Sequence, residues 1–124
     1  GIIKTETPRT FYFDPSYSAP EDIKDDQGRV IVAKGTTVNP LVSLAWGQPL
    51  IFIDGEDESQ LTWSLKQTGK IVLVRGSPIL LQEKLGKSFY FDQAGIYTKK
   101  FGIKQVPAIV AQEGFQLKIS EVSV

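Results

Sequence analysis

The chain has 124 residues, of which 41% are hydrophobic and 23% charged, so it can bury one modest core like an ordinary globular domain. Lys and Arg together number 14, as do Asp and Glu, and this balance argues against nucleic acid or another polyanion as a partner. The chain has no Cys and no His, which excludes thiolate metal sites and catalysis by a thiol or an imidazole.

Residues 1–48 contain most of the seven prolines and are predicted to be an irregular segment with a small β-hairpin. Phe11–Phe13 is a predicted strand that stops before the Asp-Pro step, because a residue before proline is pushed out of helix. Arg29–Val32 and Thr36–Val38 are predicted to pair as the two strands of the hairpin. A hairpin of this size is not stable alone, so we expect it to pack on the rest of the chain.

Residues 49–124 are predicted to form one domain in which strands alternate with helices. The longest apolar runs are far shorter than the roughly 20 residues that cross a bilayer, so no membrane insertion is expected. This pattern predicts the α/β class, with a mixed sheet and helices on both faces. The predicted strands are Leu50–Ile53, Ile71–Val74, Phe89–Phe91, Ala108–Ala111 and Phe115–Ile119, and the predicted helices are Glu56–Thr68, Pro78–Leu85 and Ala94–Phe101.

The stretch Phe101–Val110 resembles the short helix, glycine step and proline loop of thioredoxin-like domains. The resemblance implies a cis peptide bond before Pro107 and places Arg75–Pro78 where thioredoxins keep a Cys-x-x-Cys pair, which is absent here. A redox-inactive domain without a cofactor is therefore expected. Thioredoxin-like proteins bind extended peptides beside these loops, so the resemblance implies a partner-binding groove formed by Arg75, Ser77, Pro78, Val106 and Pro107.

A more extensive resemblance, to the TraW family of F-type conjugative type IV secretion systems, covers most of the chain. It implies a periplasmic protein without catalytic activity, needed for pilus assembly and DNA transfer, that acts with a TrbC-like partner. TraW proteins carry a signal peptide and a helical region ahead of the Phe-Asp-Pro motif, so we expect this chain to be the carboxyl-terminal domain. The matching motifs are Phe13-Asp14-Pro15, Asp22-Ile23, Gly28-Arg29, Asn39-Pro40-Leu41, Phe52–Asp57, Val74–Ser77, Tyr90–Gln93 with Gly95, Gly102-Ile103 and Gln105–Ala108.

Three features allow two interpretations each. Asp54, Glu56 and Asp57 follow a predicted strand and could serve a metal-dependent hydrolase, or they could cap the next helix and balance its dipole. Trp63 lies off the Leu61 and Leu65 stripe and is either a core residue or an interface aromatic. The chain ends soon after its last strand, without the final helix of thioredoxin-like domains. We expect residues 1–48 to fold back over that sheet face, the alternative being a partner.

Overall fold

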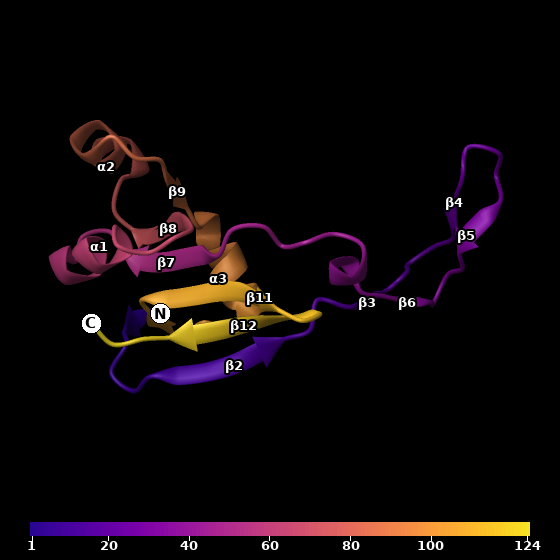
Figure 1. Cartoon of the computed structure of the whole chain (residues 1–124), viewed down its shortest axis with the longest axis horizontal. Coiled ribbons are helices and arrows are strands. Elements are labelled where there is room, and N and C mark those ends of the chain that lie inside the picture. Colours follow the sequence, from indigo (N-terminus) through magenta and orange to yellow (C-terminus); the bar gives the residue numbers. More distant parts are fainter.

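Six strands form the central sheet of the computed structural model, which describes all residues from Gly1 to Val124, and their spatial order is β2-β12-β11-β7-β8-β9 (Figure 1). The neighbouring strands β7, β8 and β9 run parallel to one another. The pairs β7-β11, β11-β12 and β12-β2 are antiparallel. The predicted α/β class with a mixed sheet is confirmed. The strands are β2 (Arg9–Phe13), β7 (Leu50–Asp54), β8 (Lys70–Arg75), β9 (Phe89–Phe91), β11 (Ala108–Glu113) and β12 (Gln116–Glu121).

Alternate residues of the central strands supply two separate cores, one on each face of the sheet. Ile51 and Leu73 belong to one core, which the helices α1 (Glu58–Ser64) and α2 (Pro78–Leu85) cover. Phe52 and Val72 belong to the other, which α3 (Ile96–Phe101) and a short 3-10 helix at Pro40–Val42 cover. Helices on both faces were predicted, and no helix has the length and apolarity that crossing a bilayer requires.

The first helix is shorter than the sequence predicts. It ends at Ser64, because the amides of Lys66 and Gln67 bond back three residues rather than four and so tighten the chain into turns. Leu65, predicted on the inner stripe, is consequently 39% exposed, while Gln60 and Ser64 are buried. The predicted third helix, Ala94–Phe101, begins only at Ile96, because left-handed backbone at Ala94 and Gly95 separates α3 from a 3-10 turn over Gln93–Gly95.

The proline-rich segment contributes a strand to the sheet. Residues of β2 pair with β12 in antiparallel register, Phe13 opposite Leu117 and Arg9 opposite Glu121. The segment therefore extends the sheet at its edge instead of folding back over the face expected to be bare. On that face Tyr12 is 50% exposed, which corrects the expectation. The division into 1–48 and 49–124 stays a prediction.

Residues between β2 and the short 3-10 helix form an arm that projects away from the sheet (Figure 1). Its base is the pair β3 (Tyr17–Ser18) and β6 (Thr37–Val38), and its tip is the pair β4 (Ile23–Lys24) and β5 (Val30–Val32). The predicted pairing of 29–32 with 36–38 is wrong, because Asp25 accepts three hydrogen bonds that close a turn directly between β4 and β5. The expected packing of the hairpin on the rest of the chain is also wrong for this tip.

Glu121, at the end of β12, joins three distant segments of the chain. Its carboxylate is buried and accepts two hydrogen bonds from Arg9, at 2.9 and 3.0 Å. It also accepts from the amides of Lys104 and Gln105 and from the Gln105 side chain. Burial alone would raise the pKa of this carboxyl, but the hydrogen bonds outweigh burial and lower it to about 2.

Candidate functional site

The parallel strands β7 and β8 end at the same edge of the sheet, where Asp54 and Arg75 lie side by side. The Arg75 guanidinium bonds the Asp54 carboxylate at 3.1 Å, and its other nitrogen donates to the Ile2 carbonyl at 2.7 Å. A Cβ on Gly55 would lie 2.9 Å from the Arg75 carbonyl oxygen, so only glycine permits this close approach of the two strand ends. Arg75 is exposed and forms the centre of this edge.

The turn after β8 begins α2. The Ser77 hydroxyl accepts from the Leu80 amide at 3.2 Å, and Pro78 takes the first helical position. Ser77 is therefore the N-cap of α2. Ile79 and Leu80 follow on the first turn of the helix and are 72% and 66% exposed. They were not among the residues predicted to contact a partner.

The loop before β11 contains the cis bond between Val106 and Pro107 that the thioredoxin resemblance predicts. Both residues are buried. A short strand β1 (Ile3–Lys4) pairs in parallel with β10 (Gln105–Val106), and the Thr5 amide donates to the Val106 carbonyl at 2.8 Å. Ile3 and Thr5 therefore already form hydrogen bonds with backbone carbonyls of this loop, those of Lys104 and Val106.

The five residues predicted to form the groove do not face a common cavity. Ala108, directly after Pro107, pairs with Phe52 of β7. Because β7 lies between β11 and β8, the turn after β7 is closer to Pro107 than the turn after β8, which contains Ser77. Arg75 and the start of α2 are accessible, whereas Val106 and Pro107 lie beneath β1. The use of these five residues by a partner stays a prediction.

The acidic residues after β7 are engaged in capping and ion pairs. Asp57 accepts from the amides of Ser59 and Gln60 at the start of α1 and pairs with Lys4 at 3.1 Å. The hydrogen bond from the Ser59 hydroxyl, with those from Lys4 and the amides, holds the pKa of Asp57 well below its usual value. Asp54 pairs with Arg75, and no three acidic side chains converge on a point that could hold a metal ion. The capping interpretation is confirmed, and the metal-dependent hydrolase has no support.

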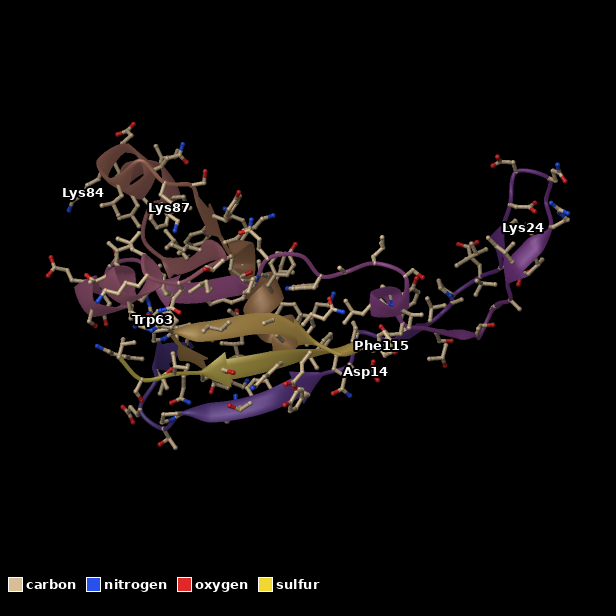
Figure 2. The ribbon with its side chains drawn as sticks, viewed as in Figure 1. Asp14, Lys24, Trp63, Lys84, Lys87 and Phe115 are labelled. Carbon is tan, nitrogen blue, oxygen red and sulfur yellow. The ribbon has the colours of Figure 1, made fainter.

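Trp63 lies on α1 and packs partly buried against the core on that face (Figure 2). Its use as an interface aromatic stays a prediction. Sequence analysis missed a cavity of about 560 Å³ on the opposite face, lined by Trp46 and Tyr97 among others. Trp46 precedes the predicted domain boundary and Tyr97 lies about 50 residues later. No local sequence pattern therefore indicates that the two side chains line one cavity.

One curated protein provides the comparison with known sequences. The chain is 41% identical over 116 residues to Protein TraW of Escherichia coli (strain K12). The aligned region is 90% of this chain and 55% of that protein, so the chain spans about half the length of its relative. No protein-family model matches the chain, and no solved structure matches it.

Proposed function

Because the chain belongs to the TraW family across its 116 aligned residues, we propose that it is a component of an F-type conjugative type IV secretion system. In this proposal it acts in the periplasm, in pilus assembly and DNA transfer. The 41% identity to Protein TraW is the observation that carries the proposal. The chain spans only 55% of that protein, so a role in the activity of the whole relative is part of the proposal.

Within that system the chain is a docking domain without catalysis or redox activity, and it uses no cofactor. The composition supports this, since Cys and His are absent. The site geometry supports it as well, because Asp54 and Asp57 are held by cations and by helix amides and are not free to act on a substrate.

We describe the fold of this domain as thioredoxin-like. The support is the strand order β12-β11-β7-β8, with β7 and β8 parallel, and the cis Val106-Pro107 bond directly before β11. Helix α3 packs on the face opposite α1 and leads into the loop that contains Pro107. Helix α2 and the edge strand β9 are then additions to this thioredoxin-like arrangement. Since β7 is the strand beside β11, the turn at Asp54–Asp57 takes the place of the Cys-x-x-Cys turn, instead of Arg75–Pro78.

The partner contacts this domain at what we term the docking edge, the side of the sheet where β7 and β8 end. Its predicted members Arg75, Ser77 and Pro78 lie around the start of α2, and β1 covers Val106 and Pro107. Exposed apolar side chains support the choice of this edge, since they cost free energy when they face water. They are Ile3, Ile79 and Leu80, at 52%, 72% and 66% exposure. Trp63 is a further candidate contact.

The proposed partners are other proteins of the secretion system, a TrbC-like protein among them. Zero net charge agrees with a protein partner and argues against a polyanion. No nucleic-acid contact is part of the proposal.

A chimera tests the docking edge. The aligned region of Protein TraW is replaced by this chain, and DNA transfer is measured from a plasmid that lacks its own copy. Ile79→Glu with Leu80→Glu is expected to lower transfer at least about tenfold, because a charge in a buried contact costs more than 1.4 kcal/mol. Val30→Glu with Ile31→Glu, at 50% and 64% exposed positions of β5 in the arm tip, is the matched control and leaves transfer unchanged. Equal transfer by both variants, at equal protein levels, would contradict the docking edge.

A further inference from the structure

The cavity of about 560 Å³ lies at the opposite side of the sheet from the docking edge, where the parallel strands begin. Leu50 and Lys70 are the first residues of β7 and β8, and both line the cavity. The segment Trp46–Gln48, which leads from the arm into β7, forms one wall, and Tyr97 of α3 forms another. A cavity of this volume accommodates one large side chain with neighbouring backbone.

The walls of the cavity are mainly apolar and aromatic. The Trp46 ring is held edge-on against Phe101, with centroids 6.1 Å apart, and its amide donates to the Gln112 side chain at 2.8 Å. Tyr97 stacks on the same Phe101 ring at 6.4 Å. Trp46 and Tyr97 are therefore fixed by a common neighbour, which prepares the cavity for an apolar or aromatic group without a large ordering cost.

Lys70 is the only charged side chain that lines the cavity. Its ammonium lies 5.9 Å from the centre of the Tyr90 ring and has no acidic partner, since the four ion pairs of the chain involve other residues. A free cation at the mouth of an apolar cavity complements a carboxylate attached to an apolar group. A neutral ligand would form no ion pair with this ammonium.

The neighbouring strand explains why the occupant is a polypeptide. β9 is the last strand of the sheet and pairs only with β8, so its outer edge carries unpaired backbone groups. Tyr90 and Phe91 of β9 also line the cavity. An extended segment that adds to this edge would place one side chain in two over the cavity.

We propose that this cavity receives an extended segment of a partner protein that carries one large apolar side chain and, two residues along on the same face, a carboxylate, with the apolar group between Trp46 and Tyr97 and the carboxylate on Lys70. As a site for a protein partner the cavity rests on the proposed docking role, but it is a second surface, remote from the docking edge.

The test uses the complete 124-residue chain labelled with nitrogen-15 and four pentapeptides, Ac-Gly-Trp-Gly-Glu-Gly-NH₂ and its analogues with Gln for Glu and with Phe or Ala for Trp, each named by its two variable residues. The Trp-Glu and Phe-Glu peptides are expected to shift the amide signals of Gly47, Lys70 and Tyr90 saturably, with dissociation constants of about 1 mM or below. The Gln peptide binds about two- to fivefold more weakly, as an exposed ion pair predicts. The Ala peptide does not saturate.

Two variants assign the carboxylate. Lys70→Gln is expected to abolish the preference for Glu over Gln, and Lys84→Gln, on α2 at the other face, keeps it (Figure 2). Saturable shifts at other residues, no saturation by the Trp-Glu peptide, or an unchanged preference in Lys70→Gln would each overturn the proposal. Peptide binding is measured on the isolated chain, so its failure leaves the transfer experiment on the docking edge unaffected.

Discussion

Replacing Glu121 by glutamine removes the charge that holds β2, β12 and the loop before Pro107 together. Both carboxylate oxygens receive N–H donors, and the side chain is 0% exposed. Glutamine keeps one acceptor and turns an NH₂ group toward other donors, so at least one buried donor loses its partner. Arg9 keeps a partly solvated charge without its counter-ion, because its own side chain is 46% exposed.

The lowered pKa gives the size of the effect. The step from an ordinary 4.5 to about 2 is 2.5 units of pKa, or about 3 kcal/mol of stability at neutral pH. A carboxyl whose folded-state pKa is depressed contributes this stability above pH 4.5 and loses it as the pH falls toward 2. With these two pKa values, about 2 kcal/mol of the contribution is lost between pH 7 and pH 3.

Chemical denaturation followed by circular dichroism at pH 7 and pH 3 measures the effect. Glu121→Gln is expected to lower the free energy of unfolding by about 3 kcal/mol at pH 7 and by about 1 kcal/mol at pH 3. Glu83→Gln, at an exposed position of α2, is the control and changes it by less than about 0.5 kcal/mol at either pH. A loss below about 1 kcal/mol at pH 7, or the same loss at both pH values, would show that the hydrogen bonds of the Glu121 carboxylate do not stabilise the fold.

Three further predictions concern other parts of the fold. Asp57→Ala removes the cap of α1 and the partner of Lys4, and is expected to lower the free energy of unfolding, measured in urea, by about 1 to 2 kcal/mol. Asp57→Asn keeps a capping oxygen and should lose less, so equal losses for the two variants would contradict the prediction. Replacing the arm tip, residues 23–32, by a short Gly-Ser turn should change the stability by less than about 0.5 kcal/mol, because the tip packs on nothing else, and a larger loss would show hidden contacts. Calorimetry with magnesium, calcium and manganese should give no saturable heat, and a site tighter than about 0.1 mM would revive the hydrolase interpretation.

Local patterns in the sequence were sufficient for residues 49–124. The continuous apolar runs became β7 and β8, and Ser77-Pro78 began a helix, because burial on both faces and N-capping are properties of a few adjacent residues. The helix ends were less predictable, since α1 stops at Ser64 through a tightening of turns that no glycine or proline marks.

The first segment could not be placed because its contacts are distant along the chain. β2 pairs with β12, more than 100 residues later, and β1 pairs with β10 over a similar separation. One signal was available at Glu121, which continues the buried alternation of Leu117 and Ile119 and is therefore an inward-facing carboxylate. Such a position requires a cation, and the sequence alone did not indicate that Arg9 supplies it.

In the proposed function, this chain performs the part of a TraW protein that its 116 aligned residues represent. The most direct measurement is DNA transfer and pilus formation by an F-type plasmid that lacks its own TraW and receives the unmodified chimera. The chimera is expected to restore both, well above the level of an empty vector. A chimera that is present in the periplasm at normal amounts and is folded, but restores neither, would show that this chain does not replace the aligned part of TraW.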